Sequence, residues 1–232
     1  MSKILIVTAV PAERDAILAI RHSAAGRLAE LPVQRCQTGA GLVDLICGGV
    51  GAVAAALSTA AALGQQVGYQ LVIAAGIGGG FGPAVPGSLV VADAVVQADL
   101  GAQTADGGFC PLSELGWGEV RFDLDPDLTG QLAGRTGART GAVLTVSTVT
   151  GTAARAALLH KAHPDALAEA MEGAGVYQAA ARANTRFAEL RAISNPVGPR
   201  DRDSWQIPAA LAALGRAFDQ ILAEPLTQGA AP

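Results

Sequence analysis

The chain has 232 residues, of which half are apolar and 16% are charged, and its formal net charge is −4. This acidic balance argues against nucleic acid or an anionic membrane as the main partner. No linker-like or charge-rich stretch divides the sequence. We therefore expect one domain over residues 1–226, followed by a flexible tail over 227–232.

The cysteines and the apolar stretches indicate where the protein is located and whether it binds a metal. The sequence contains three cysteines, Cys36, Cys47 and Cys110. An odd count without a CxxC pair indicates neither a disulfide framework nor a zinc site, and reduced thiols fit a cytoplasmic location. The N-terminal apolar run is too short to be a secretory signal, and the longest Ala-rich stretch, 50–63, is too short to span a bilayer. We expect a cytoplasmic protein that needs no metal or cofactor.

The first half of the chain alternates strand-like and helical patterns. Buried strands are predicted over residues 3–9, 33–37, 42–47, 71–75 and 88–97, with Gly39-Ala40-Gly41 as a hairpin turn. Pro11 suits the first turn of a helix that runs to about Ile20, and an Ala-rich helix follows the glycines at 48–51. Residues 76–82 are predicted to be a glycine-rich loop, and residues 100–120 a mobile loop.

The second half continues the alternation. Strands are predicted over residues 142–146, 165–170 and 188–194, and helices over 153–161, 173–183 and 204–222, with Ser204 as the N-cap of the last helix. Continuously apolar strands are typical of a sheet that is covered on both faces. The predicted fold is a single α/β domain with a central, mixed, twisted sheet flanked by helices on both faces.

The segment 191–201 concentrates polar groups where an apolar strand ends. It contains Ser194 and Asn195, two stiffening prolines, and Arg200 next to Asp201. In α/β domains, ligands bind at the carboxyl ends of strands, and an amide, an arginine and a carboxylate can all bind a polar heterocycle. The alternative is an ordinary strand-to-helix connection with a surface ion pair.

Two glutamates stand at similar junctions. Glu13 lies where the first strand turns into a helix, so it is either a charge favoured by the helix N-terminus or a general base that activates water. Glu172 is preceded by Met171 and followed by Gly-x-Gly. An ionised carboxylate only accepts hydrogen bonds, so Glu172 can bind two sugar hydroxyls while Met171 packs against the sugar. The alternative for this pair is a helix-terminal charge and a core methionine.

The remaining patterns mainly exclude known nucleotide-binding and nucleophile motifs. The glycines at 76–82 lack the dinucleotide-binding spacing, and the chain has no P-loop motif, but clustered glycines still allow a backbone to approach a ligand closely. The three histidines, His22, His160 and His163, are predicted to lie on helix surfaces. No serine lies in a nucleophile elbow.

These positions together resemble the nucleoside phosphorylase and nucleosidase superfamily, and within it the futalosine hydrolase family. The resemblance covers nearly the whole chain. It is carried by residues 8–13, 76–82, 98–101, 171–174 (Met-Glu-Gly-Ala) and 194–201 (Ser-Asn-Pro-Val-Gly-Pro-Arg-Asp). The Met-Glu motif is typical of the superfamily, and the last segment is typical of futalosine hydrolases.

The resemblance implies a role for each position. Glu13 stands where nucleosidases have the carboxylate that activates water, and Glu172 where they hold the ribose 2′- and 3′-hydroxyls above Met171. Asn195 stands where adenine-specific members have an aspartate. Other substrate-binding positions are implied at Gly78, Thr150, Gly151, Thr152 and Asp201. The stacking aromatic of the adenosine nucleosidases is missing near Thr150, and Phe109 or Trp117 is a possible substitute.

Asn195 favours a base with a carbonyl at C6 over adenine. A carboxylate accepts from the adenine amino group but repels a carbonyl oxygen, whereas an amide donates to O6 or N7. The resemblance therefore implies hydrolysis of futalosine to hypoxanthine, in menaquinone biosynthesis, by a homodimer or larger homo-oligomer. The alternatives are an adenosine-type nucleosidase, a purine nucleoside phosphorylase and a non-catalytic nucleoside-binding protein.

Overall fold

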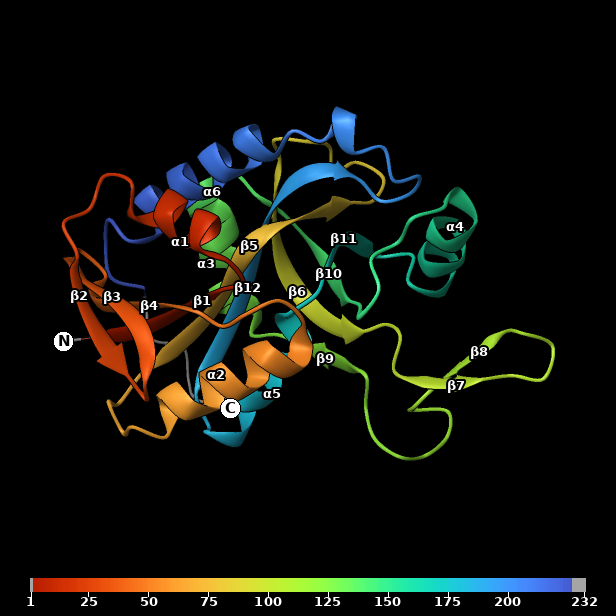
Figure 1. Ribbon diagram of the computed structural model, residues 1–232, viewed down its shortest axis with the longest axis horizontal. Coiled ribbons are helices and arrows are strands. Elements are labelled where there is room, and N and C mark those ends of the chain that lie inside the picture. The colour runs from red at the N-terminus through yellow and green to blue at the C-terminus, as the bar shows by residue number, and fades with distance from the viewer. Residues whose placement is uncertain (1, 227–232) are drawn as a thin grey trace.

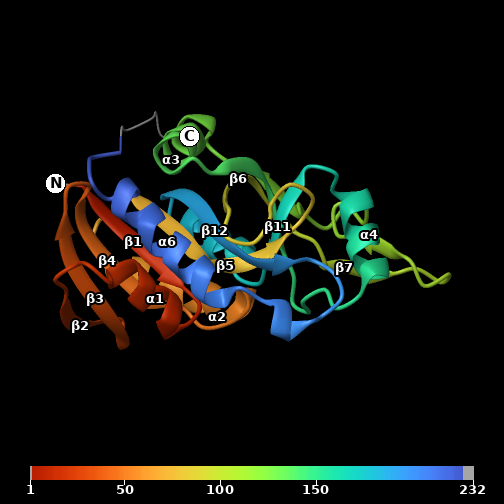
Figure 2. The same cartoon turned by 90° about the horizontal axis from the view of Figure 1, so that it is seen from above.

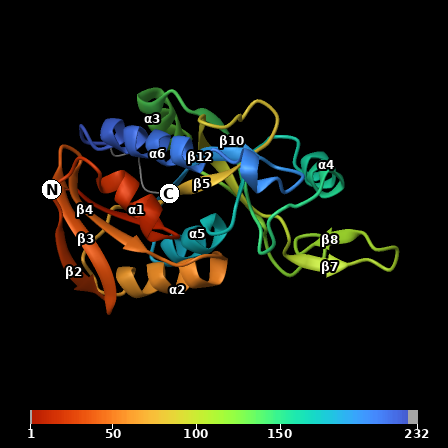
Figure 3. The same ribbon diagram turned by 45° about the horizontal axis from the view of Figure 1, so that its top comes forward.

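The computed structural model describes residues 2–226, which form a sheet between two layers of helices (Figure 1). One face of the sheet is covered by α1 (Pro11–Leu18), α3 (Pro126–Thr136) and α6 (Ile207–Ile221). The other face is covered by α2 (Ala52–Leu63) and α5 (Gly173–Arg182). Figure 3 shows α3 and α6 above the strands and α2 and α5 below them. The predicted fold class is confirmed.

Ten strands form the main sheet, in which parallel and antiparallel pairs are mixed. In chain order the strands are β1 (Lys3–Thr8), β2 (Ala24–Leu28), β3 (Leu31–Thr38), β4 (Gly41–Cys47), β5 (Leu71–Gly80), β6 (Leu89–Gln97), β9 (Arg121–Asp123), β10 (Arg139–Thr145), β11 (Ala166–Ala170) and β12 (Arg186–Pro196). They are ordered β11-β10-β6-β12-β5-β1-β4-β3-β2, with β9 paired to β6. The predicted β3–β4 hairpin is confirmed.

One end of the sheet closes on itself. β5 pairs with β12, β12 with β6, β6 with β10, β10 with β11, and β11 returns to β5. The closing pair is short and antiparallel, with Ala168 opposite Gly80 and Glu169 opposite Gly79. This closure brings the ends of β5, β11 and β12 together (Figure 2).

Buried apolar side chains form three clusters, and the two larger ones lie on the two faces of the sheet. The first joins α1, α3 and α6 to the sheet and includes Ile17, Leu132 and Phe218, all fully buried. The second joins α2 and α5 to the opposite face and includes Ala55 and Ala174, both fully buried. Burial on both faces explains why the strands read as continuous apolar runs.

The predicted glycine loop is wrong, because β5 continues through Gly80. The glycines are needed for space in the sheet. A Cβ on Gly76 would lie 2.5 Å from Glu13 Oε1, and one on Gly78 would lie 2.8 Å from the Glu169 carbonyl oxygen. The pattern marks a strand that Glu13 and Glu169 approach closely, which a turn-based interpretation of clustered glycines missed.

Residues 100–120 are not a structureless loop. They contain a small hairpin of β7 (Gly101–Gln103) and β8 (Phe109–Pro111), which projects away from the sheet in Figure 1. This pairing was not predicted, because each strand is only three residues long and the many glycines around the strands obscure the strand pattern. That the segment is mobile stays a prediction.

Four further differences concern elements and their ends. The prediction lacked β2, β9 and α3, and it placed the start of α6 too early. Ser204 is not the N-cap of α6. It lies in a short 3₁₀ helix, η1 (Arg202–Ser204), where its hydroxyl donates to the Asp201 carbonyl, and α6 begins only at Ile207. The remaining helix, α4 (Ala153–Ala162), was predicted. The predicted tail at 227–232 lies outside the described residues.

Within residues 2–226, no helix is long and apolar enough to cross a membrane.

Candidate active site

A cavity of about 240 Å³ lies at the carboxyl ends of β1, β5, β11 and β12. It is lined by Ala9, Val10, Glu13, Val50, Ile77, Gly78, Gly79, Val149, Thr150, Glu169, Ala170, Met171, Glu172, Ser194, Asn195, Val197 and Trp205. The polar groups among these residues come from segments far apart in the sequence. This is the position at which α/β sheets bind their ligands.

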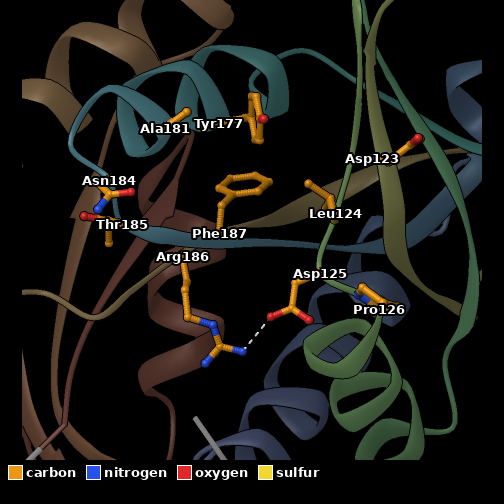
Figure 4. Close-up of a pocket in the computed structure, with 10 residues that line it drawn as sticks. All are labelled: Asp123, Leu124, Asp125, Pro126, Tyr177, Ala181, Asn184, Thr185, Arg186 and Phe187. Carbon is orange, nitrogen blue, oxygen red and sulfur yellow. Dashed lines mark hydrogen bonds and ion pairs between the residues drawn. The ribbon is translucent and has the colours of Figure 1, made fainter. Parts of the chain in front are cut away.

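A larger hollow of about 460 Å³ lies at the other end of β12 and contains none of the predicted site residues (Figure 4). Figure 4 shows Arg186 and Asp125 pointing toward each other across it, at 2.8 Å. Tyr177 and Phe187 form an edge-to-face pair in its wall. Since Arg186 and Asp125 are paired, the smaller cavity with its converging acids is the better candidate.

Glu13 is held by backbone N–H groups at the base of the cavity. Its carboxylate accepts from Ala9 (2.9 Å) and Val10 (3.3 Å) through Oε2, and from Ile77 (2.9 Å) through Oε1. Through the Val10 bond, the Glu13 carboxylate accepts from the backbone N–H of the N-cap residue of α1. The side chain is 4% exposed, and this burial raises the pKa of Glu13, although Arg191 and the backbone donors oppose the rise.

Glu172 lies at the N-terminus of α5 and belongs to the same charged group. It accepts from the Gly51 N–H at 3.1 Å through Oε1, and its Oε2 lies 3.2 Å from Arg191 Nη1. Arg191 projects from β12, whose continuation carries Asn195. Glu172 is thus tied to α2 on one side and to β12 on the other.

Glu189 completes this group from behind. It is fully buried, and its Oε1 accepts from Arg191 Nε at 2.8 Å. Burial raises the pKa of Glu189 despite the neighbouring Arg191. Burial opposes the charge of Arg191, but its three carboxylate neighbours outweigh this effect and raise the pKa of Arg191. Gly173 is required beside them, because a Cβ there would overlap the Glu189 carboxylate.

Asn195 lies across the cavity from these acids. Its Oδ1 accepts from the Ser194 hydroxyl at 2.8 Å, and its Nδ2 donates to the Pro196 carbonyl at 2.9 Å. The Pro196 carbonyl can only accept, so this contact identifies which end of the amide is the nitrogen. The second hydrogen on Nδ2 stays available to a ligand.

The structure brings most of the predicted positions together, but not all of them. Glu13, Gly78, Thr150, Met171, Glu172 and Asn195 line the cavity. Gly151 and Thr152 do not. Thr152 is the N-cap of α4, where its hydroxyl accepts from the Arg155 N–H. Asp201 is exposed and lies outside the lining.

The aromatic residue of the cavity is Trp205, which the sequence analysis did not single out. Its half-buried ring lies 5.8 Å from the Arg200 guanidinium carbon. Phe109 and Trp117, the two predicted substitutes, are 50% and 76% exposed and do not line the cavity.

Three charged residues were also missed, Glu169, Glu189 and Arg191. Each had a signal in the sequence, because charged side chains in a strand that is buried on both faces need partners there. Glu189 and Arg191 alternate within an apolar run, and Glu169 interrupts another.

Among residues 2–226, no group of three or more His, Cys, Asp or Glu side chains is placed to hold a metal ion.

Residues 3–224 match the family model described as the phosphorylase superfamily. Over 227 residues, the chain is 54% identical to the futalosine hydrolase of Streptomyces coelicolor, with 94% of each chain covered. The chain belongs to the futalosine hydrolase family. A more distant futalosine hydrolase, from Thermus thermophilus, is 38% identical over 76% of this chain and 79% of its own.

Solved structures with the same fold include nucleosidases. The S-adenosylhomocysteine nucleosidase of Streptococcus pyogenes, in complex with 5-methylthiotubericidin, superposes with a TM-score of 0.79 at 24% identity, covering 96% of this chain and 95% of its own. The methylthioadenosine/S-adenosylhomocysteine nucleosidase of Colwellia psychrerythraea, in complex with adenine, gives the same TM-score and identity over 97% and 98%. At 24% identity, these structures show that the chain shares their fold.

Proposed function

We propose that the protein hydrolyses the N-glycosidic bond of futalosine and releases hypoxanthine, as a step of menaquinone biosynthesis. One observation carries the proposal. Glu13, Glu172 and Asn195, which are far apart in the sequence, line one cavity in a chain that is 54% identical to a futalosine hydrolase. Loss of a purine from ribose passes through an oxocarbenium-like sugar, as in other glycoside cleavage.

Glu13 is the general base in this proposal. It takes a proton from a water molecule that attacks C1′. A general base works best when its pKa lies near the operating pH, and burial shifts Glu13 in that direction. Backbone donors from Ala9 and Ile77 hold the carboxylate in place.

Glu172 binds the ribose diol above Met171. A carboxylate accepts from two hydroxyls, and its charge stabilises the cation that develops on the sugar. The ion pair with Arg191 fixes the orientation of Glu172, so that little reorganisation is needed in the transition state.

Asn195 recognises the base. One hydrogen of Nδ2 is donated to the Pro196 carbonyl, which leaves the other to be donated to O6 or N7 of hypoxanthine. Trp205, which lines the same cavity, offers an apolar ring to the base.

The nearest alternative is an adenosine-type nucleosidase, because the solved relatives with this fold include one bound to adenine. Asn195 opposes this alternative, since an amide NH₂ faces the adenine amino group as one donor to another. Phosphorolysis is disfavoured, because none of the described residues lining the cavity is Lys or Arg, and Glu13 would repel phosphate.

The proposed enzyme is cytoplasmic and acts as a homodimer. Its three cysteines are free thiols. The α2 region exposes Val50, Val53 and Leu57, and Val50 also lines the cavity. An exposed apolar group of this kind is typical of an interaction surface, and a second copy seated on it would enclose the cavity.

Incubation with futalosine in phosphate-free buffer tests the proposal. We expect stoichiometric hypoxanthine, and the 1-phosphate of the 5′-substituted ribose should not form when phosphate is added. Asn195→Asp should lower kcat/KM for futalosine relative to the adenine analogue by at least tenfold. No release of hypoxanthine from wild type, or an unchanged substrate ratio in Asn195→Asp, would contradict it.

A further inference from the structure

Glu169 is an acid in the cavity wall that the proposed reaction does not use. It lies on β11, is 5% exposed and lines the cavity. Its Oε1 accepts from the Thr150 N–H at 2.8 Å, and its Oε2 accepts from the Thr150 hydroxyl at 2.5 Å. Both contacts come from one residue, so the carboxylate is fixed in orientation.

Glu169 and Asn195 face each other across one glycine. In the sheet, Gly79 pairs with Glu169 of β11 on one side and with Asn195 of β12 on the other. Residues paired in this way project to the same face. A Cβ on Gly79 would lie 3.5 Å from Asn195 Nδ2, which places the amide on that face. Adjacent strands lie about 4.8 Å apart, so the outer two strands are roughly 10 Å apart.

The gap between these two side chains has an apolar floor. A Cβ on Gly79 would lie 2.8 Å from Val197 Cγ2, so Val197 lies over Gly79. Val197 also lines the cavity. A flat ring resting on Val197 would have a carboxylate at one edge and an amide at the other.

Hypoxanthine and adenine differ in hydrogen bonding at N1 and at the substituent on C6. Hypoxanthine has an acceptor at O6 and a donor at N1–H, whereas adenine has a donor at its amino group and an acceptor at N1. A carboxylate can only accept, and after two hydrogen bonds it still has lone pairs available. An acceptor beside N1 therefore attracts hypoxanthine and repels adenine.

We propose that Glu169, which faces Asn195 across Gly79 in the cavity wall, accepts the N1–H of a 6-oxopurine base and is a specificity-determining residue of the enzyme. This assignment rests on the proposed function. Glu169 and Asn195 together match the acceptor and donor pattern of hypoxanthine, and Thr150 positions the Glu169 carboxylate.

Glu169→Gln tests the proposal, since it keeps the shape but presents an NH₂ group to the base. We expect kcat/KM for futalosine to fall by roughly 10- to 100-fold, because a mismatched polar group in a binding site discriminates strongly. The value for the adenine analogue with the same 5′ substituent should stay constant or rise. The matched control is Glu119→Gln, an exposed acid outside the cavity, which should leave both values unchanged.

The ratio between the two nucleosides separates recognition from a structural role. If Glu169 only held the segment around Thr150, both substrates would lose activity equally, and that outcome would overturn the proposal. A wild-type protein that releases no hypoxanthine refutes the proposed function instead.

A second measurement uses the wild-type protein and does not depend on the folding of a variant. Hypoxanthine labelled with ¹⁵N at N1 is bound as the free base, and its N1–H is followed by NMR. We expect a retained N1 proton that is shifted downfield, as for a hydrogen bond to a carboxylate. An N1–H signal at the position of the free base would overturn the proposal.

Discussion

Glu13, Glu172 and Glu189 surround the guanidinium of Arg191 in the interior of the protein. Counted as ionised, three carboxylates and one cation leave a net charge of −2. Burial resists that charge, and the raised pKa values of Glu13 and Glu189 follow from it. The protonation of this group sets the net charge beside the cavity.

Glu13→Gln removes the proposed base while keeping the size of the side chain. We expect kcat for futalosine to fall by about 10²- to 10⁴-fold, the usual contribution of a positioned base. The affinity for free hypoxanthine should be nearly unchanged, because Glu13 faces the sugar in the proposal. Steady-state kinetics and calorimetry measure the two effects, and a variant with the wild-type rate would remove Glu13 from the mechanism.

The pH dependence of the reaction follows from the same residue. A general base acts only when ionised, so the role proposed for Glu13 predicts that activity is lost as the pH falls through its pKa. Since burial raises this pKa, the acid limb of kcat/KM should lie above about 4.3, the ordinary value for a glutamate. A profile from pH 4 to 9 measures it, and full activity at pH 4 would contradict the assignment.

Glu189→Gln tests how the charges are coupled. Without Glu189, the charge of Arg191 is less compensated and stabilises the ionised form of Glu13 more strongly. The acid limb should then move to lower pH. Breaking a buried ion pair also costs about 3–5 kcal/mol, so urea unfolding should occur at lower concentration. An acid limb that stays in place or rises would show that Glu189 does not act on Glu13.

At the residue scale, the sequence predicted the polar residues that stand next to glycines or at strand ends. Glu13, Glu172 and Asn195 fall at such junctions, and all three line one cavity. The partners within strands, such as Glu189 and Arg191, were not predicted. Their importance depends on which strands are neighbours, and the order of strands in a sheet is not encoded locally.

At the scale of elements, the sequence predicted most strands and helices, because burial on both sheet faces produces long apolar runs. Helix α3 was missed although its signals are present. Asp125 caps it, Pro126 opens it, and Gly137 ends it in a left-handed conformation (φ 66°). The helix contains two further glycines, at 130 and 134, which obscure the pattern.

The packing of α5 against α2 gives a prediction about stability. A Cβ on Gly175 would overlap the Ala52 carbonyl, so Gly175→Ala must push the helices apart. We expect a loss of about 1–3 kcal/mol in the free energy of unfolding. The control is Gly130→Ala in α3, where a Cβ meets nothing within 4 Å, and which should gain up to about 1 kcal/mol. Urea denaturation compares the two, and equal effects would contradict the packing argument.

At the scale of the whole molecule, the exposed apolar residues on and before α2 predict association. The protein should elute as a dimer of its 23.2 kDa chain, as measured by light scattering. The pair Val53→Glu and Leu57→Glu should yield monomers with lower activity, because Val50 of the same region lines the cavity. Leu158→Glu, an equally exposed leucine on α4, is the control. A variant pair that remains dimeric would place the interface elsewhere.

The group around Arg191 also suggests how the protein binds a cationic transition state more tightly than a neutral substrate. An electroneutral nucleoside leaves the surplus of anionic groups in place, whereas a sugar with a full positive charge supplies the missing counter-ion. Iminosugar inhibitors that are protonated at neutral pH should therefore raise the melting temperature far more than uncharged analogues of equal size. The surplus negative charge, which burial disfavours, thus makes the cavity selective for a cationic sugar.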